Sequence, residues 1–499
     1  MKVSMWKVLF LVVLMGAAIC GSVPAEAGTV FKLARAEDVA YWDPLDHFNL
    51  VNYTINCAMY DQLVARTEDG QYKPRAATSW EMREEGKVWN FKLRNDIVFH
   101  NGEKLTAHSV KNTIERFLSE KLRQSSNWAH LDSVELVNDY EVNIKFKEPN
   151  GAFMSLIACF SILPMDTVNK TGKDEFFKHP IGSGPYKFVE WVQGQRIVLE
   201  KNNDYWGEKG RVDRIEYYPI MEDTTRVSAL RAGDVDFVDN VPADMIKLLE
   251  SDPEIEIQRY NTFDAIYIGL KCNRPPFNDV NARKALHMCL DRKGIVDAIL
   301  GGGAPSNWPV PRGVLGDNPG YPLQEMDVEG AKAALKASNY DGKELVLSAP
   351  STWYARTKEV LQAVQSQMAE VGFKVRIEMM DGAAFMERRA AGAYDFYYTG
   401  CAQLGGDPIV YLSQRIQNDS MKSEYDNDQL KKMVADVEKV ADPQKRAEGL
   451  RAVFQVMMDE HAPHMFVYEI ENISAKKKNI KGEIMYPDKI LDFALVEKN

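Results

Sequence analysis

The sequence predicts an α/β fold made of more than one domain. Short segments in which apolar and polar residues alternate are separated by longer segments with apolar residues every three or four positions. These are the periods of strands and of helices, respectively. The chain has 499 residues, 45% of them hydrophobic, which is enough to bury more than one core.

The N-terminus has the three parts of a secretory signal peptide. Lys2 and Lys7 precede an apolar stretch at residues 8–19, and Ala25-Glu26-Ala27 supplies the small residues of a cleavage site. We expect cleavage after Ala27, which removes residues 1–27 and leaves an exported protein. No other apolar run is long enough to span a bilayer, so no membrane insertion is expected after cleavage.

A helix and a hairpin are expected in the first half of the mature chain. The helix should cover residues 106–118 with Thr106 as its N-cap. Its apolar face would carry Val110, Ile114, Phe117 and Leu118. Strands around residues 186–188 and 197–199 alternate apolar and polar positions on either side of a Gln193-Gly194 turn, as the strands of a half-buried hairpin do.

Two helices and a strand are expected in the second half. A helical pattern at residues 360–371 is followed by Gly372, which suits a C-cap. Residues 373–378 then alternate as a strand does. Asp442-Pro443 places a capping residue before a first-turn proline, which opens another helix. The apolar face of that helix would carry Leu450, Val453, Phe454 and Met457.

The mature chain is acidic. Cleavage removes two lysines and one glutamate, so the formal charge becomes (61 − 2) − (72 − 1) = −12. Nucleic acids and anionic lipids require clustered cations, and the run at residues 476–478 is too short to provide them. The sequence therefore argues against nucleic acid and membrane surfaces as partners.

Five cysteines remain after cleavage: Cys57, Cys159, Cys272, Cys289 and Cys401. Their pairing cannot be read from the sequence, and an odd number leaves at least one thiol unpaired or in an intermolecular bridge. Burial as small apolar side chains is the simplest interpretation. No lipid anchor is expected on Cys20, because Ile19 precedes it where lipoproteins have a small residue.

No motif of a catalytic or cofactor site occurs in the chain. The patterns G-x-S-x-G, H-E-x-x-H and the glycine-rich phosphate-binding loops are absent. His461 and His464 precede an expected strand, and a turn containing Pro463 explains them better than metal ligation does. We expect no enzyme activity, no cofactor and no metal site.

Three long segments resemble a known family and occur in its order. The first, PRAATSWEMREEGKVWNFKLRNDIVFHNGEKLTAHSV, covers residues 74–110; the second, IGSGPYKFVEWVQGQRIVLEKNNDYWG, covers residues 181–207; the third, PPFNDVNARKALHMCLDRKGI, starts at residue 275. Together they resemble the extracellular solute-binding proteins of ABC importers, in the dipeptide, oligopeptide and nickel-binding group known as family 5. The similarity extends from about residue 30 to the C-terminus.

This resemblance implies a two-lobe periplasmic-binding-protein fold, type II-like, with an extra subdomain in the first lobe. Mapped onto this chain, lobe 1 takes residues 28–65 and 184–274, its inserted subdomain residues 66–183, lobe 2 residues 275–474, and a return strand to lobe 1 residues 475–499. The implied function is that of a monomeric substrate-binding component. It would capture a small organic solute between the lobes and deliver it to an inner-membrane ABC permease complex.

The segment YDFYYTGCAQLGGDP, which ends at Pro408, departs from the pattern of the peptide-binding members. There it resembles G-W-x-x-D-x-x-D-P, whose middle Asp pairs with the α-ammonium of the peptide. Aligning Gly400 and Asp407 with this pattern puts Cys401 at the Trp and Leu404 at the middle Asp. Without that carboxylate an ammonium would stay unpaired, unless a shift in the alignment brings Asp407 into its place.

The arginine that clamps the peptide carboxylate in dipeptide binders maps to about Ala349, so both ends of the clamp are missing. Candidate ligand-binding residues are instead aromatic or cationic, together with the two positions just named: Tyr41, Trp42, Trp353, Tyr354, Arg356, Arg389, Tyr398, Cys401 and Leu404. Each aromatic could equally be a core residue, and each arginine could pair a ligand anion or an acid of the other lobe.

Other functions remain open at this point. A nickel-complex or metallophore binder would use the same fold with arginine and aromatic contacts. A secreted hydrolase or a chaperone-like binder would belong to other classes, and the missing nucleophile motif argues against the first of these. The identity of the solute, and whether peptides bind at all, do not follow from the sequence.

Overall fold

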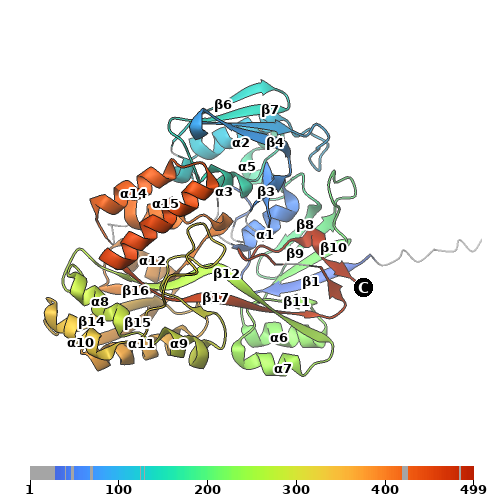
Figure 1. The fold of residues 1–499 in the computed structure, drawn as a ribbon. Coiled ribbons are helices and arrows are strands. Elements are labelled where there is room, and N and C mark those ends of the chain that lie inside the picture. Colours follow the sequence, from blue (N-terminus) through green and yellow to red (C-terminus); the bar gives the residue numbers. More distant parts are fainter. Residues whose placement is uncertain are drawn as a thin grey trace, which may run out of the picture.

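The computed structural model describes residues 28–39, 41–46, 50–67, 71–123, 125–128, 130–417, 425–482 and 485–499 (Figure 1). The expected signal peptide and its Cys20 lie outside these ranges. Within them, no helix has both the length and the apolar character needed to cross a bilayer.

One large mixed sheet runs through the whole molecule (Figure 1). Over the described residues it has eleven strands: β15 (Val375–Met380), β14 (Leu345–Pro350), β16 (Phe396–Ala402), β12 (Ile255–Leu270), β17 (His464–Lys477), β11 (Phe237–Val238), β1 (Val30–Arg35), β10 (Arg214–Pro219), β9 (Arg196–Lys201) and β8 (Tyr186–Val192) in spatial order, with β13 (Ala304–Pro305) beside β17. We call the side with β11, β1 and β8–β10 lobe 1 and the side with β14–β16 lobe 2.

The long strands β12 and β17 belong to both lobes. They pair antiparallel from Ile255↔Lys477 in lobe 1 to Gly269↔His464 in lobe 2. The ladder is interrupted between Asn261 and Ala265, where the two lobes meet. Because an irregularity of this kind bends a strand, we expect motion between the lobes to occur here.

Lobe 1 carries a second, four-stranded sheet. Its order is β4 (Ala77–Arg83), β5 (Val88–Leu93), β7 (Glu141–Phe146) and β6 (Leu131–Asn138). With it go α2 (Ala107–Ser119), α3 (Phe153–Ala158), α4 (Met165–Thr171) and α5 (Lys173–Phe176), at the top of Figure 1. The expected helix after Thr106 is confirmed, and Thr106 forms a capping box with Ser109. We call this unit the inserted subdomain.

The remaining elements of lobe 1 surround its part of the large sheet. They are α1 (Leu50–Met59), the pair β2 (Val64–Arg66) and β3 (Tyr72–Pro74), α6 (Asp223–Ala232), α7 (Ile246–Glu250), and the pair β18 (Ile480–Lys481) and β19 (Glu497–Lys498). The expected hairpin is confirmed as β8 and β9, and Gly194 supplies the positive φ of +70° that its turn requires.

Helices cover both faces of the sheet in lobe 2. One face holds α8 (Val280–Met288), α9 (Arg292–Gly294), α10 (Val328–Ala337) and α11 (Thr357–Val371). The other holds α12 (Gly382–Ala390), α13 (Ile409–Leu412), α14 (Asp428–Glu438) and α15 (Pro443–Val456). Two expected helices are thereby confirmed: Gly372 ends α11 in the left-handed conformation, and the side chain of Asp442 caps α15.

The side chains of the central strands alternate between two cores. On β12, Ile266 and Ile268 point to the core with α8–α11, whereas Ala265 and Tyr267 point to the core with α13–α15. The second core lies on the side of the inserted subdomain. Parity along a strand therefore decides which residues can face the space between the lobes.

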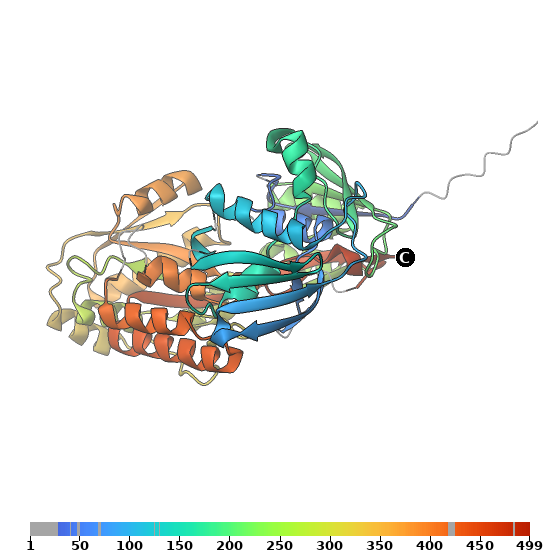
Figure 2. The ribbon, with the colours of Figure 1, turned by 90° about the horizontal axis from the view of Figure 1, so that it is seen from above.

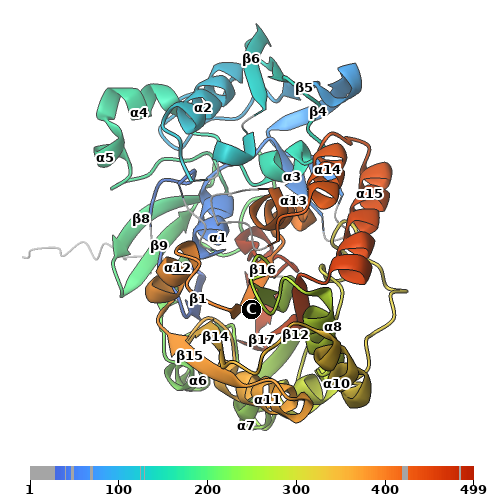
Figure 3. The same ribbon diagram turned by 90° about the vertical axis from the view of Figure 1, so that its left-hand side faces the viewer.

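The inserted subdomain touches lobe 2 at the turn between α14 and α15 (Figures 1 and 3). The backbone N–H of Gly151 donates to the carbonyl of Glu438 at 2.7 Å, and the Lys439 ammonium lies 2.5 Å from the Glu148 carboxylate. A β-carbon at Gly151 would lie only 1.9 Å from the carbonyl oxygen of Val440. Figure 2 shows the orange-red helices α14 and α15 beside the blue and teal strands of the inserted subdomain, seen from above. We call this contact between the subdomain and lobe 2 the tip contact.

His100 joins two of the segments that resemble family landmarks. Its Nδ1 accepts from the backbone N–H of Gly182 at 3.3 Å, and its Nε2 donates to the carbonyl of Gly184 at 3.0 Å. This pattern requires the neutral ring, because a proton on Nδ1 would face the N–H of Gly182. Burial is the main reason that the pKa of His100 falls to about 4.

The pH dependence of the free energy of unfolding should show the titration of His100. In the unfolded chain the ring binds its proton near pH 6.5. The neutral ring of the folded protein therefore contributes fully to the free energy of unfolding above pH 6.5, and this contribution is lost as the pH falls toward 4. The total loss is roughly 3 kcal/mol. Urea unfolding at several pH values across this range gives the free energy of unfolding as a function of pH. Its slope against pH should be shallower for His100→Gln than for the parent. The exposed His108 provides the control, and an unchanged slope in His100→Gln would contradict the assignment.

Candidate functional site

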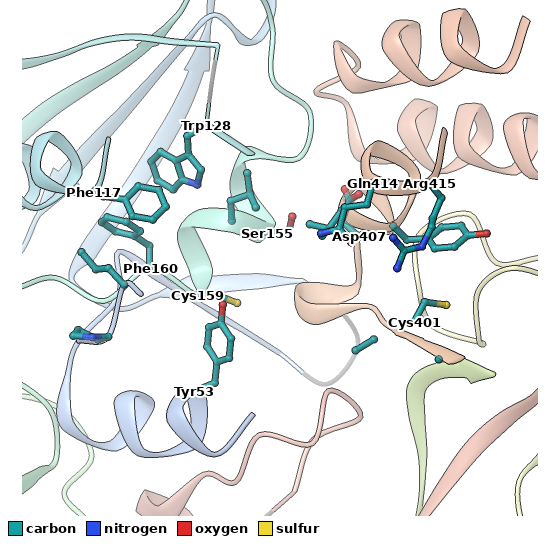
Figure 4. Close-up of a pocket in the computed structure, with 17 residues that line it drawn as sticks. Tyr53, Phe117, Trp128, Ser155, Cys159, Phe160, Cys401, Asp407, Gln414 and Arg415 are labelled. Carbon is teal, nitrogen blue, oxygen red and sulfur yellow. The ribbon is translucent and has the colours of Figure 1, made fainter. Parts of the chain in front are cut away.

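A cavity lies between the inserted subdomain, the start of lobe 1 and lobe 2 (Figure 4). We call it the front cavity; its volume is about 230 Å³. Lobe 1 and its subdomain contribute Pro44, Leu45, Tyr53, Phe117, Trp128, Ser155, Leu156, Cys159 and Phe160, and lobe 2 contributes Gly400, Cys401, Ala402, Asp407, Val410, Tyr411, Gln414 and Arg415. A solute held there would touch both lobes, as a clamped ligand must.

The wall from the inserted subdomain is apolar and rigid. The rings of Phe117, Trp128 and Phe160 pack on one another with centroid distances between 4.9 and 5.6 Å. All three side chains are buried in the core of lobe 1, so only part of each ring faces the cavity. This wall can hold an apolar body by shape and dispersion.

The wall from lobe 2 carries the charged groups, to the right in Figure 4. Asp407 accepts from Arg446 through both carboxylate oxygens, at 2.7 and 3.0 Å, and the two side chains are 2% and 1% exposed. Asp407 Oδ1 also accepts from the backbone N–H of Ile409 at 2.9 Å. Because this carboxylate is already neutralised by a bidentate arginine, it is poorly placed to bind the ammonium of a ligand.

Tyr411 and Arg415 stand on the same side of the helix that follows Asp407-Pro408. The hydroxyl of Tyr411 lies 2.6 Å from Nδ1 of His464, and Nε of Arg415 donates to the hydroxyl of Tyr267 at 2.9 Å. Sequence reasoning missed both residues. Their spacing of four after a proline that opens a helix was the signal that could have found them.

A second cavity of about 290 Å³ lies behind the first, and we call it the rear cavity. Cys159 lines both cavities. The rear cavity is bounded mainly by lobe 1, including Cys57, Arg66 and Asp488, and it reaches Phe263 in the break of β12 and Gly405 of lobe 2. Gly400, Cys401, Ala402 and Asp407 line the front cavity and Gly405 lines the rear one, so the segment 400–407 contributes to both.

Of the predicted site residues, Cys401 lines the front cavity, beside the backbone of Gly400. Leu404 begins the turn Leu404–Gly406, and its side chain is outside the described part. Tyr398 is buried in the opposite core, where its hydroxyl lies 2.7 Å from that of Tyr468. Tyr354 holds the backbone of β16, since its hydroxyl accepts from the N–H of Gly400 in that strand at 2.7 Å.

The other three predicted aromatic residues lie apart from both cavities. Trp42 is buried against Phe188 and Trp191, with centroid distances of 4.9 and 5.7 Å. Tyr41 is 47% exposed and lies under the guanidinium of Arg123. Trp353 is 43% exposed and packs with its edge on Phe385 and Tyr354.

The two predicted arginines also stand away from the cavities. Arg389 is buried under β16, where it donates to the hydroxyl of Tyr397 at 2.7 Å and lies over that ring. Arg356 is partly exposed at the start of α11, 3.7 Å from Glu359. Their role as ligand anchors stays a prediction, and neither is among the residues that line the front or the rear cavity.

The described residues contain no cluster of three or more His, Cys, Asp or Glu that could hold a metal ion. His461 and His464 each hydrogen-bond a tyrosine hydroxyl, Tyr425 and Tyr411, at 2.7 and 2.6 Å. No disulfide joins the five cysteines of the described part.

Comparison with known proteins identifies the family. The model of the bacterial extracellular solute-binding proteins, family 5, matches residues 71–422. The oligopeptide-binding protein AppA of Bacillus subtilis is 28% identical over 463 residues, which cover 87% of this chain and 84% of that protein. The alignment thus spans most of both chains.

Solved structures share the fold over nearly the whole chain. The periplasmic binding protein DppA from Helicobacter pylori, in complex with peptide STSA, superposes with a TM-score of 0.82 at 23% identity and covers 94% of this chain and 98% of its own. NikZ from Campylobacter jejuni, in complex with Ni(L-His), does so with a TM-score of 0.80 at 20% identity, covering 94% and 99%. The predicted two-lobe fold is confirmed, and the chain belongs to family 5 of the bacterial extracellular solute-binding proteins.

Proposed function

We propose that this protein captures a small organic solute between its lobes in the periplasm and delivers it, as a monomer and without chemical change, to an inner-membrane ABC permease. Membership of a family of solute-binding proteins supports the importer role. The front cavity supports the mode of capture, because both lobes line it. Closure about the break in β12 would enclose the solute. We retain the predicted domain limits as part of this proposal.

The solute we propose has an apolar body and lacks a free ammonium group. Asp407 is the one carboxylate among the described residues that line the front cavity, and Arg446 holds both its oxygens. Ala349 lies buried in β14, paired with Met379 of β15, and brings no charge. An ammonium in this cavity would lose its water without gaining a counter-ion, which is costly.

Free dipeptides and tripeptides should accordingly bind poorly. In a thermal-shift panel, a ligand at ~100 times its dissociation constant would stabilise the protein by about 2.7 kcal/mol. We expect most unmodified dipeptides to give no such shift. Clear shifts with many unrelated dipeptides would show that a carboxylate outside the front cavity, or a rearranged Asp407, pairs with the ammonium.

Native mass spectrometry of protein purified without refolding tests the proposed function directly. A solute of defined mass that stays bound, and that is lost from a front-cavity variant such as Tyr411→Ala, supports it. Ligand with the isotope pattern of nickel would favour the second candidate, a nickel-complex or metallophore binder. That candidate gains support from Arg415 and the aromatic rings in the lining of the front cavity, which are the contacts that such a binder would use. Turnover of the bound solute would contradict a purely binding role.

A further inference from the structure

The rear cavity is not explained by capture of a compact solute in the front cavity. It is comparable in volume, at about 290 Å³ against about 230 Å³, and Cys159 belongs to the lining of both. A ligand that extends past the shared residue Cys159 would therefore contact both cavities.

Arg66 is the notable group of the rear cavity. Its guanidinium lies 4.8 Å from the centroid of the Phe263 ring, and its Nε is buried with no acceptor among the described residues. It forms no ion pair with any carboxylate of those residues. Arg75, which also lines this cavity, differs in that it is paired with Asp61 at 3.0 Å. The side chain of Arg66 as a whole is half-buried, so its charge is only partly solvated and is open to an anion that enters the cavity.

Lobe 2 covers this arginine. A β-carbon at Gly405 would lie 3.2 Å from Ser155 of the inserted subdomain, and one at Gly406 would lie only 2.0 Å from Nη2 of Arg66. Both glycines have positive φ, +68° and +67°, which suits residues without a β-carbon. Arg66 therefore sits where the lobes meet, and anything bound to it is enclosed by closure.

The surroundings favour a group with a single negative charge. Asp488 is half-buried in the lining of the same cavity and forms no ion pair with Arg66. A doubly charged phosphate would be repelled by this carboxylate, whereas a carboxylate can still use the planar fork of the guanidinium.

We propose that the rear cavity is a second ligand subsite. In it, Arg66 binds the terminal carboxylate of an elongated solute. The body of this solute lies in the front cavity, and its other end carries no charge. This inference rests on the proposed function. Phe263 holds the guanidinium from one face, and Gly406 closes over it. The ligand class is thus an N-blocked or otherwise amine-free linear carboxylic acid.

The test uses N-acetylated alanine peptides of about three to six residues as probes, each as the free acid and as the C-terminal amide. Isothermal calorimetry of the parent should show the longer acids binding roughly 10- to 100-fold more tightly than their amides, the range for a charge-assisted hydrogen-bonded pair. Arg66→Gln should abolish this difference by weakening the acids only. Lys73→Met, an exposed cation at the rim of the same cavity, should preserve it.

Two results would overturn the proposal: no preference for acid over amide in the parent, or an undiminished preference in Arg66→Gln. Arg66→Lys keeps the charge without the fork and should restore part of the preference, which separates a binding role from a folding defect. If a co-purified solute is found but the acid preference is absent, the proposed function stands and this inference fails.

Discussion

Replacing Arg446 by methionine is expected to lower the free energy of unfolding by about 3–5 kcal/mol. Each nitrogen of the guanidinium donates a hydrogen bond inside the protein: Nε and Nη2 donate to Asp407, and Nη1 donates to the carbonyl of Val437 at 2.6 Å. Methionine fills much of the stem volume but leaves the carboxylate buried without its cation. Chemical denaturation monitored by tryptophan fluorescence measures the loss.

Two comparisons make this expectation specific. Arg451→Met removes an arginine of the same helix whose pair with Asp317 is 40% and 27% exposed, and it should cost about 1 kcal/mol or less. The double variant Arg446→Met, Asp407→Leu removes both charges and should be more stable than the single variant. If the single and double variants were equally destabilised, the packing of the side chain and not its charge would be responsible.

Alanine at position 151 is expected to weaken solute binding roughly 10- to 100-fold through lost closure. The added β-carbon would lie 1.9 Å from the carbonyl oxygen of Val440, against at least 3.4 Å for an ordinary contact. That neighbour is backbone, so it cannot rotate away as a side chain could. The tip contact, including the Gly151–Glu438 hydrogen bond, must open, and the closed form becomes less populated.

Gly320→Ala is the matched control, because the nearest atom to its added β-carbon is 3.7 Å away. Calorimetry with the co-purified solute should show parent affinity for that variant. Small-angle scattering should show compaction on binding for the parent and less for Gly151→Ala. Full affinity in Gly151→Ala would mean that the solute does not require the tip contact.

Much of the fold could be predicted because its signals are local. The Thr106 cap, the Gly372 stop and the Asp442-Pro443 start each depend on a few neighbouring residues, and each occurs where it was expected. The pairing of β12 with β17 has no such local signal in the sequence. A strand was expected after His464, but nothing local shows that it continues to Lys477 and serves both lobes.

The site was only partly predictable. The family-like segment around Gly400 and Asp407 led to the front cavity, yet parity along β16 separates two of the candidates: Cys401 faces the cavity side and Tyr398 faces the other core. Arg66 belongs to no motif. Its position in the rear cavity depends on how distant segments pack, which a single sequence does not report.

The crossing strands also constrain how the protein can come into being. Ile255 pairs with Lys477 and Gly269 with His464, so the middle of the sheet joins residues about two hundred positions apart in the chain. During synthesis, β12 emerges long before its partner, with one side of its ladder unoccupied. Such non-local pairing folds slowly. The nascent chain therefore cannot complete its central sheet before residues 464–477 have been made, and both lobes depend on this one late pairing.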